Sequence, residues 1–287
     1  MARKRRVPAP ASGPRKLPVI ESSYLEALTT GMVASFINER IQICGLAPKT
    51  GNRFRQIIGT LINWAVSQRG VRLPGGINPA KGVRRYKEPA PTIRFLRLPE
   101  IAQQLAVFKD RPLLQTLVAV YIYGGLRREE ALWLTLDDVD LERKLIHVRA
   151  KHTADGFWQP KTGVNRVVPI GSDLRGYLAA YVPPTSAGRW MFPSPTGKHW
   201  DPDNLSQDIR AANGAVGLPW GCLDFRHTFG SQLASAGRSL HQIAKFMGNS
   251  PEICRRHYAA LVPEEMHAVV EFPKMVAGAG GPTTVAT

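Results

Sequence analysis

Four side chains in this sequence have the chemistry to act on a phosphodiester: Arg127, Lys161, Arg226 and Tyr258. An arginine guanidinium keeps its charge and matches two phosphate oxygens, so two arginines can clamp one phosphodiester and stabilise the charge that develops on it. A tyrosine beside cations can attack as phenolate. A lysine crowded by cations has a lowered pKa and can protonate a leaving oxygen. Taken singly, each residue is better explained as packed, paired or solvated.

The stretch from Leu223 to Tyr258 contains two of the four, an arginine near its start and the tyrosine at its end. Apolar residues at helical spacing lie between them, which predicts helices. We expect three helices here: Asp224–Ala236, Leu240–Met247 and Pro251–Ala260. Their partners must come from elsewhere in the chain, Arg127 from the start of an earlier helix and Lys161 from a hairpin.

The charge of the chain indicates the kind of partner. The formal net charge is +16 and the isoelectric point is near 10.2, which favours nucleic acid or an acidic membrane surface as partner; solubility alone is the other explanation. No apolar run reaches the roughly 18 residues of a transmembrane helix, and no signal peptide is evident. Cys44, Cys222 and Cys254 form neither a disulfide framework nor a CxxC metal site, which predicts a reducing, cytoplasmic location.

Composition and periodicity divide the chain into five segments. Residues 1–19 are predicted to be a disordered basic arm, because Pro, Ala, Gly and Ser surround its Lys and Arg residues. Residues 20–85 form a small all-α domain that is short for independent stability, and residues 86–95 form a basic linker. Residues 96–262 form the larger domain. Residues 263–287 are a tail with one short amphipathic segment.

Two helices are expected in the small domain. The first presents one apolar face: Met32, Val33, Phe36, Ile37 and Ile41. In the second, six apolar residues are expected to face inward: Phe54, Ile57, Ile58, Leu61, Ile62 and Ala65. Five positive charges on this helix and at the end of the small domain are candidate DNA contacts: Lys49, Arg53, Arg55, Arg84 and Arg85. For one helix alone, a solvated face is the simpler explanation of such charges.

The larger domain combines helices with a short change of period. Residues 113–123 (LLQTLVAVYIY) are almost wholly apolar and are predicted to be its buried centre. Leu145, His147 and Arg149 alternate with Ile146 and Val148, which predicts strands, and Lys161-Thr162-Gly163 is expected on a hairpin connection. The predicted fold class is therefore mainly α with a small antiparallel β-sheet.

Four blocks occur in a specific order: GGLRREEALWLTLDDVD, KTGVNRVVPI, FRHTFGSQLASAG and MGNSPEICRRHYAAL. In this order they resemble the tyrosine recombinase (phage integrase) family, and the resemblance covers about residues 25–262. It implies a helical core-binding domain followed by a mostly α-helical catalytic domain. The first helix of the core-binding domain is reduced here to a fragment near Tyr24–Leu28.

The resemblance also implies roles for individual residues. Arg127 and Arg226 resemble the two arginines of the family, and Glu130 resembles the acid that supports the site. Lys161 resembles the hairpin lysine that protonates the 5′-hydroxyl leaving group. Tyr258 resembles the nucleophile that forms a 3′-phosphotyrosyl link to DNA. The implied reaction is two rounds of strand transesterification, which need no metal and no cofactor.

Two positions depart from the family pattern. The family usually has HxxRH around its second arginine, and Leu223 replaces the first of these histidines. The family usually has Gly-His or Gly-Trp before the nucleophile helix, where Asn249 stands here; its amide can bond a phosphate oxygen but carries no charge. His227 is counted among the supporting residues with Glu130 and Asn249. Helical geometry is nevertheless expected to turn His227 and His257 away, as packed structural histidines.

The sequence thus predicts a site-specific DNA recombinase or integrase of a mobile element. It is expected to act on double-stranded DNA as a homo-tetramer, in the cytoplasm at the nucleoid and without a membrane partner. The tail, residues 263–287, is a candidate helix for docking on a neighbouring protomer. The alternative is a catalytically impaired, recombinase-derived DNA-binding protein, because Leu223 and Asn249 replace family histidines. A general basic nucleic-acid-binding protein with accidental motif matches is a third explanation.

Overall fold

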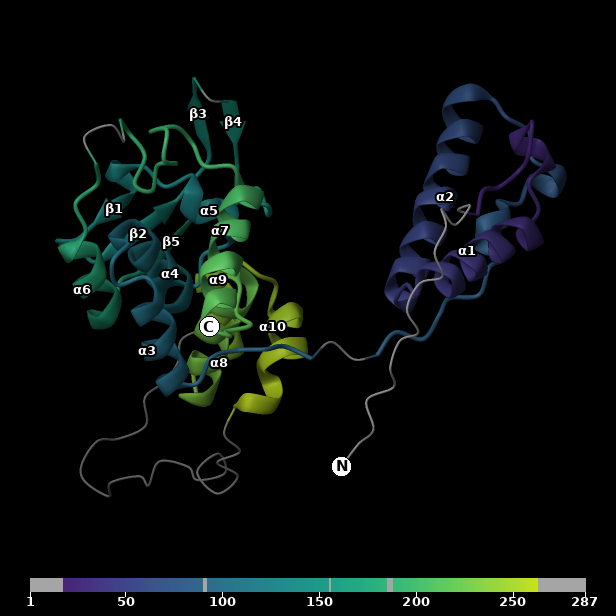
Figure 1. Cartoon of the computed structure of the whole chain (residues 1–287). Coiled ribbons are helices and arrows are strands. Elements are labelled where there is room, and N and C mark those ends of the chain that lie inside the picture. The colour runs from purple at the N-terminus through teal and green to yellow at the C-terminus, as the bar shows by residue number, and fades with distance from the viewer. Residues whose placement is uncertain (1–17, 90–91, 155, 185–187, 263–287) are drawn as a thin grey trace, which may run out of the picture. The chain divides into compact units, whose positions relative to one another are not determined.

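A computed structural model describes residues 18–89, 92–154, 156–184 and 188–262 (Figure 1). The chain divides into two compact units, residues 1–90 and residues 91–287. The predicted basic arm lies almost entirely outside the described residues, and the whole tail, residues 263–287, lies outside them with its candidate docking helix. None of the described helices is both long and apolar enough to cross a membrane.

The first unit is built on two helices, α1 (Thr30–Cys44) and α2 (Pro48–Arg69), which Figure 1 shows side by side. Local signals set the bounds of α1: the hydroxyl of Thr29 accepts from the N–H of Met32, and Gly45 ends the helix in the left-handed region. Short 3₁₀ turns complete the unit at Leu25–Ala27, Pro74–Gly76 and Pro79–Lys81. Its small core contains Val33, Ile37, Ala80 and Val83.

The predicted inward face of α2 is partly wrong. Ile62 and Ala65 are buried, but Ile57 and Leu61 are each 52% exposed, and Trp64 is also exposed. The reason is that α1 and the 3₁₀ turn at Pro79–Lys81 cover α2 from one side. Apolar residues on its other side therefore have no described element to pack against.

The linker expected at residues 86–95 is shorter than the sequence indicated. Tyr86 packs against the core of the first unit, and the amide of Asn52 bonds both the backbone of Tyr86 and the carboxylate of Glu88. At the other end, the guanidinium of Arg94 bonds Asp224, with 2.7 Å between Nη2 and Oδ2. Both ends of the expected linker therefore belong to the units that they adjoin.

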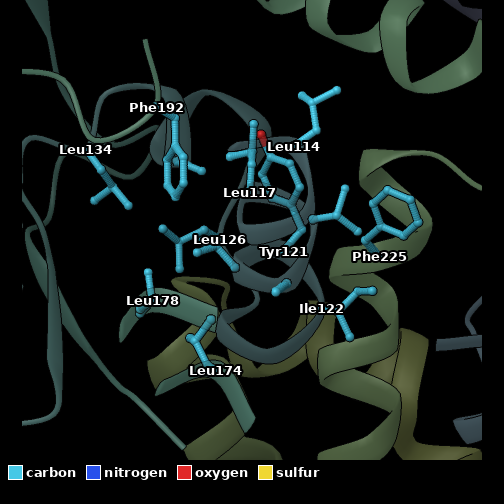
Figure 2. Packing of buried hydrophobic residues seen from close by; sticks show 14 of the residues in the cluster. Leu114, Leu117, Tyr121, Ile122, Leu126, Leu134, Leu174, Leu178, Phe192 and Phe225 are labelled. Atoms are coloured by element: carbon cyan, nitrogen blue, oxygen red, sulfur yellow. The ribbon is translucent and has the colours of Figure 1, made fainter. Parts of the chain in front are cut away.

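The second unit contains eight α-helices within the described residues: α3 (Leu98–Val107), α4 (Pro112–Gly124), α5 (Arg128–Leu132), α6 (Ser172–Ala180), α7 (Pro202–Ala215), α8 (Cys222–Ser235), α9 (Leu240–Met247) and α10 (Pro251–Tyr258). As predicted, α4 is the buried centre. Figure 2 shows its side chains among Leu174 and Leu178 of α6, Phe192, and Phe225 of α8. This packing fixes α8 against the C-terminal end of α4, where Arg127 follows.

The strands form two small antiparallel sheets in the part of the chain that the structure describes. One has the order β1-β2-β5 (Val139–Asp140, Leu145–Val148 and Arg166–Pro169). In β2, Ile146 and Val148 face the core. The other pairs β3 (Lys151–Thr153) with β4 (Gly156–Trp158). The predicted fold class, mainly α with a small antiparallel sheet, is confirmed.

A second apolar cluster joins α8, α9 and α10. It contains Ala234, Ile243, Ala244, Met247, Cys254 and Tyr258. This cluster places the tyrosine of α10 and the arginine of α8 in one compact region. The capped ends of α9 and α10 direct the loop between them: Gly248 ends α9 in the left-handed region, and the hydroxyl of Ser250 accepts from the N–H of Ile253.

Shortening one buried side chain of α4 tests how much this core contributes to stability. Leu117 is fully buried, so Leu117→Ala removes apolar burial and leaves a cavity, at an expected cost of about 2–5 kcal/mol in unfolding free energy. Leu98→Ala is the matched control, because Leu98 is 70% exposed and its truncation should change stability by less than about 0.5 kcal/mol. The measurement is urea unfolding followed by tryptophan fluorescence. Equal effects of the two variants would contradict this account of the core.

Candidate functional site

A buried carboxylate holds three arginines together. Glu130 lies in α5, with its side chain 1% exposed. Its Oε1 accepts from Nη1 of Arg127 at 2.7 Å, and its two oxygens accept from Arg166 at 2.9 and 2.6 Å. Nη1 of Arg226 lies 3.7 Å from Oε2. The arginines come from the start of α5, from β5 and from α8, so Glu130 connects three parts of the fold.

The cluster has a net positive charge. Burial alone would raise the pKa of Glu130, but the hydrogen bonds and charge of Arg166, the backbone N–H of Arg127 and the charge of Arg226 lower it to about 2. Glu130 is therefore ionised at neutral pH. Burial and the charge of Arg127 lower the pKa of Arg226 to about 10, which still leaves it cationic. Three cations against one carboxylate leave two uncompensated positive charges, a charge that suits a phosphate group.

Arg226 is held rigidly inside the second unit. Its side chain is 7% exposed. Nη1 donates to the carbonyl of Gly125, and Nη2 donates to the carbonyl of Met247 at 2.6 Å. Gly125 follows α4 with φ of 63°, and a Cβ there would lie 2.3 Å from the ring of Phe229. Only glycine lets the chain turn here while α8 packs this closely.

Asn249 bridges Arg127 and Arg226, the two arginines that match the family pattern. Its Oδ1 accepts from Nη2 of Arg127 at 2.8 Å and from Nη2 of Arg226 at 3.1 Å. The carbonyl of Gly248 accepts from Arg127 as well, at 2.6 Å. The loop after α9 is thus fastened to both guanidinium groups. Counting these bonds, described protein acceptors take three of the five N–H groups on each arginine and leave two for a ligand.

Tyr258, the last residue of α10, is packed against α8. It is 1% exposed. A Cβ on Gly230 would lie 2.4 Å from the Cζ atom of the tyrosine ring and 2.8 Å from its hydroxyl, so glycine is required for this approach. Burial raises the pKa of Tyr258, although the charge of Arg226 acts in the opposite direction. In this state the hydroxyl is protonated and shielded.

His227 does not point away from the site, and the expectation that helical geometry turns it away is wrong. Its Nδ1 lies 2.9 Å from the hydroxyl of Tyr258. His227 reaches Tyr258 because α10 packs directly on α8. The sequence alone does not show this packing. Burial, His257 and Arg226 lower the pKa of His227 to about 4, so the ring is neutral at neutral pH. A neutral imidazole can accept the phenolic proton.

His257 also lies near this pair, contrary to expectation. Its ring centroid is 5.5 Å from that of His227 and 6.1 Å from that of Tyr258. Burial and the charge of Arg256 lower its pKa. The two histidines therefore border the tyrosine without adding positive charge at neutral pH.

Lys161 is placed apart from this cluster. It lies in the exposed turn between β4 and β5. The short hairpin of the second sheet is β3–β4, so Lys161 follows that hairpin and does not lie in its turn. No hydrogen bond or ion pair joins its amine to another described residue. The structure thus brings Arg127, Arg226 and Tyr258 together and leaves the lysine on a neighbouring loop.

The remaining predicted site residues differ in exposure. Leu223 is 65% exposed at the start of α8 and contributes an apolar surface where the family pattern has a histidine. Lys49, Arg53 and Arg84 are exposed on the first unit. Arg85 is exposed and lies 3.6 Å from Glu88. Arg55 is committed to the fold, because it donates to the backbone carbonyls of Val83 and Lys81 at 2.7 and 3.0 Å.

Arg166 is the site residue that sequence reasoning missed. Its side chain is 8% exposed, and it donates to both oxygens of Glu130 and to the carbonyl of Phe246. It lies five residues after Lys161 within the block KTGVNRVVPI, so the block itself was the available signal. The alternation of β5 places Arg166 and Val168 on the same face, toward the core.

Within the described residues, no group of three or more His, Cys, Asp or Glu side chains could hold a metal ion. The positive charges around Glu130 are those of arginine side chains. Arg127 and Arg226 are the candidate ligands of an anion, because the Nε of each donates to no described protein acceptor, whereas Arg166 uses all three of its nitrogens.

Comparisons with known proteins identify the family to which this mainly helical domain with its clustered arginines belongs. The profile of the Phage integrase family matches residues 94–265. The chain belongs to this family.

Among curated proteins, the chain is similar to tyrosine recombinase XerC of Pseudomonas fluorescens (strain Pf-5), with 27% identity over 216 residues, 72% of this chain and 67% of that protein. Tyrosine recombinase XerA of Thermococcus kodakarensis is 25% identical over 210 residues, 71% of each chain. Several other XerC relatives are matched over only 56% of their length.

Solved structures share the fold at lower identity. The Tn1549 transposon integrase in complex with transposon right end DNA superposes with a TM-score of 0.69 at 17% identity, over 86% of both chains. A lambda integrase tetramer bound to a Holliday junction gives 0.60 at 14% identity, over 79% of this chain and 65% of that one.

Removing the positive charge of Arg166 should destabilise the cluster around Glu130. Arg166→Ala leaves the buried carboxylate of Glu130 without its bidentate partner, at an expected cost of about 3–5 kcal/mol in unfolding free energy. Arg175→Ala is the control, because Arg175 is exposed on α6 and has no ion pair with a described residue. Urea unfolding at neutral pH measures both. Two variants of equal stability would contradict the role given to Arg166.

The cluster also predicts an acid dependence. The pKa of Glu130 is lowered to about 2 in the folded chain, below its ordinary value of about 4.3. The stability that it contributes is therefore present above about pH 4.3 and is lost as the pH falls toward 2. Glu130→Gln should lose stability at neutral pH and have a shallower decline over this interval. An acid unfolding profile with the same slope as that of the unchanged chain would contradict this assignment.

Proposed function

We propose that this chain cleaves and rejoins double-stranded DNA at specific sites through a 3′-phosphotyrosyl intermediate. The observation that carries the proposal is the gathering of a tyrosine hydroxyl, two arginines with free N–H groups and a neutral histidine around a cluster with excess positive charge. Family membership supports the same conclusion. Each element of the reaction has a candidate residue.

Arg127 and Arg226 are proposed to bind the scissile phosphate. Each has two N–H groups that no described protein acceptor takes, and both groups are held at fixed positions by Glu130 and Asn249. Such preorganised charge stabilises the extra negative charge of a pentacovalent transition state without reorganisation during the reaction. Arg166 is a positioning residue in this scheme, because all three of its nitrogens donate to protein acceptors, whereas the Nε of Arg127 and the Nε of Arg226 donate to no described protein acceptor.

The proposed chemical step conserves its bonds and protons. The Tyr258 hydroxyl, which lies 2.9 Å from Nδ1 of His227 in the packed state, gives its proton to that nitrogen, and its oxygen forms a bond to phosphorus. The bond from phosphorus to the 5′ oxygen breaks, and that oxygen takes a proton from Lys161. A 5′-hydroxyl then attacks the phosphotyrosine in the reverse sense and reseals the strand. Because one phosphodiester replaces another, no energy source is consumed.

Two features of the structure have to change when DNA binds. The tyrosine is 1% exposed, so α10 must shift from the Gly230 face of α8 before its hydroxyl meets a phosphate. Lys161 must approach from its exposed turn. A phosphate between the two arginines would supply an anion that attracts the lysine and also makes the phenolic proton harder to lose, so proton acceptance by His227 is needed.

We further propose that the chain acts as a homo-tetramer on DNA, and that its DNA belongs to a mobile element. The lambda integrase tetramer on a Holliday junction and the Tn1549 transposon integrase are similar in fold, which supports both points. With double-stranded DNA as the proposed substrate, the expected location is the cytoplasm, at the nucleoid.

The second candidate function is a DNA-binding protein that no longer cuts. Two residues that differ from the family pattern favour it. Leu223 is exposed and apolar, and Oδ1 of Asn249 already accepts from both Arg127 and Arg226. Neither residue can give the charged contact of a histidine. The two functions differ in one measurable property, a covalent bond between protein and DNA.

A suicide substrate separates the two functions. A duplex that is nicked beside the cleavage site lets the short 5′-hydroxyl fragment diffuse away, which traps the phosphotyrosine. The unchanged chain should form an adduct that survives denaturing electrophoresis, and Tyr258→Phe should form none while binding the same duplex. Tyr177→Phe, in α6, is the control and should keep the adduct. An unchanged chain that binds its preferred duplex yet never forms the adduct would leave only the second function.

A sulfur leaving group tests the lysine. Lys161→Ala should slow cleavage by about 10²–10⁴-fold, because the 5′ oxygen leaves without a proton, while DNA affinity changes little. With sulfur in place of that oxygen, the leaving thiolate needs no proton, since thiols ionise near pH 8.5. Cleavage by Lys161→Ala should then return to the rate of the unchanged chain.

Lys198→Ala is the matched control for this experiment. Lys198 is an exposed lysine of the same unit, and its loss should leave cleavage of both substrates unaltered. A Lys161→Ala variant that remains slow on the sulfur substrate, or that loses affinity in proportion to rate, would identify Lys161 as a phosphate contact only.

A further inference from the structure

The loop between α9 and α10 is fastened where Arg127 and Arg226 converge. Oδ1 of Asn249 accepts from Arg127 at 2.8 Å and from Arg226 at 3.1 Å, and in both bonds the donor is the Nη2 atom. Asn249 is half-buried. One neutral amide oxygen therefore lies between the two guanidinium groups that the proposed chemistry assigns to a phosphate.

The Nη2 atom decides how each guanidinium can bind a phosphate. A guanidinium has two forks that present parallel N–H groups to a pair of oxygens, Nη1 with Nη2 and Nε with Nη2, so both forks include Nη2. In Arg127, Nη2 donates to the carbonyl of Gly248 and to Asn249. In Arg226, it donates to the carbonyl of Met247 and to Asn249. With these bonds in place, neither arginine offers a complete fork, although each keeps free N–H groups elsewhere.

A phosphate oxygen is the stronger acceptor for this position. The amide oxygen of Asn249 carries no net charge, whereas three arginines surround the single carboxylate of Glu130 and attract an anion. Hydrogen bonds between two ionised groups are the stronger kind. Exchange of the amide oxygen for a phosphate oxygen is therefore favourable, and this one displacement frees an Nη2 N–H group on both arginines at once.

Asn249 also connects the arginines to the helix of the tyrosine. It directly precedes Ser250, the N-cap of α10. Cys254, one turn into α10, is fully buried in the same apolar cluster as Tyr258. Burial raises the pKa of the Cys254 thiol, and a hydrogen bond from the side chain of Asn249 acts in the opposite direction. The amide of Asn249 thus contacts the guanidinium groups on one side and α10 on the other.

The length of α10 lets a movement at Asn249 reach the tyrosine. The helix has eight residues, which is about 12 Å at 1.5 Å per residue. Cys254 and Tyr258 are four residues apart and lie on one side of it. At the far end, Tyr258 packs on Gly230 of α8. The helix is therefore held at its start through Asn249 and at its end through the tyrosine.

We propose that the contact of Asn249 with Arg127 and Arg226 is inhibitory: its amide oxygen occupies the place of a phosphate oxygen and keeps α10 packed, until a phosphodiester displaces it and releases Tyr258. This inference rests on the proposed function and names the regulation of its site. Asn249 is a positioning residue in this scheme. The role requires a neutral acceptor, because a donor cannot bond guanidinium groups and a carboxylate would neutralise the charge that attracts the phosphate.

Hydrogen exchange of the α10 amides, measured by mass spectrometry on the full chain without DNA, tests the proposal. Inorganic phosphate is compared with sodium chloride of equal ionic strength, and calorimetry follows phosphate binding. In the unchanged chain, phosphate should speed the exchange of α10. Asn249→Ala should already exchange about 10- to 150-fold faster in chloride, the range that corresponds to about 1.5–3 kcal/mol for a hydrogen bond to a charged group. Phosphate should then add no further increase.

Asn249→Asp tests the opposite direction. The carboxylate keeps the shape of the amide and bonds the arginines more strongly. Its α10 should exchange no faster than that of the unchanged chain, and its phosphate affinity should fall because one positive charge is neutralised. Asn204→Ala is the matched control, since Asn204 is an exposed asparagine of α7 in the same unit, and it should behave as the unchanged chain. A thermal melt verifies that each variant is folded.

Three results would each overturn the proposal. The unchanged chain binds no phosphate, or it binds phosphate while the exchange of α10 stays the same. In the third, Asn249→Asp exchanges as fast as Asn249→Ala, which would make Asn249 a structural residue of the loop and not an inhibitory one.

The nicked duplex that traps the covalent adduct of Tyr258 separates these results from a failure of the proposed function. An adduct in a chain whose α10 exchange does not respond to phosphate overturns the inhibitory contact alone. A phosphate-dependent exchange with the expected variant behaviour, but without an adduct, supports the contact and overturns the strand-transfer chemistry.

Discussion

The burial of one carboxylate governs the arrangement of the candidate site. A buried charge is tolerated only when its oxygens are fully paired, and Glu130 meets this condition with three arginines from α5, β5 and α8. The pairing fixes the guanidinium groups before any ligand arrives. Because three cations surround one anion, the cluster keeps an attraction for a further anion. Stability and the fixed placement of the guanidinium groups therefore depend on the same interaction.

The nucleophile candidate is subject to an opposing constraint. Tyr258 gains stability from its packing on Gly230 and within the apolar cluster of α8, α9 and α10. The same burial raises its pKa and shields its hydroxyl. In the proposed reaction, this packing would keep the hydroxyl away from DNA until binding energy offsets the displacement of α10.

Much of the fold could be predicted because local signals and burial agree. Residues 113–123 are apolar on every side, and only a buried helix such as α4 satisfies that pattern. The inward face assigned to α2 was wrong at Ile57 and Leu61, since periodicity shows that a helix has an apolar side but cannot show how much of that side a partner covers. A small unit with two long helices covers less than a larger domain would.

The site was predictable in its members and less so in its contacts. The order of four sequence blocks indicated Arg127, Glu130, Lys161, Arg226 and Tyr258. The structure places four of them together and leaves Lys161 on another loop. The orientation of His227 could not be predicted, because it depends on α10 packing against α8 and the sequence does not give the distance between helices. Arg166 was overlooked because a charged residue in a short strand suggests an exposed edge, whereas its partner Glu130 lies far away in the sequence.

The most direct test of this account is the rate of single-turnover strand cleavage by Glu130→Gln at saturating DNA. Glutamine keeps the shape and one acceptor oxygen but removes the charge that holds three arginines. Hydrogen bonds to charged groups contribute about 1.5–3 kcal/mol each, so the cleavage rate should fall about 10- to 150-fold while DNA affinity remains within a few-fold of the unchanged chain. A cleavage rate equal to that of the unchanged chain, in a folded variant, would contradict the central role of this buried carboxylate.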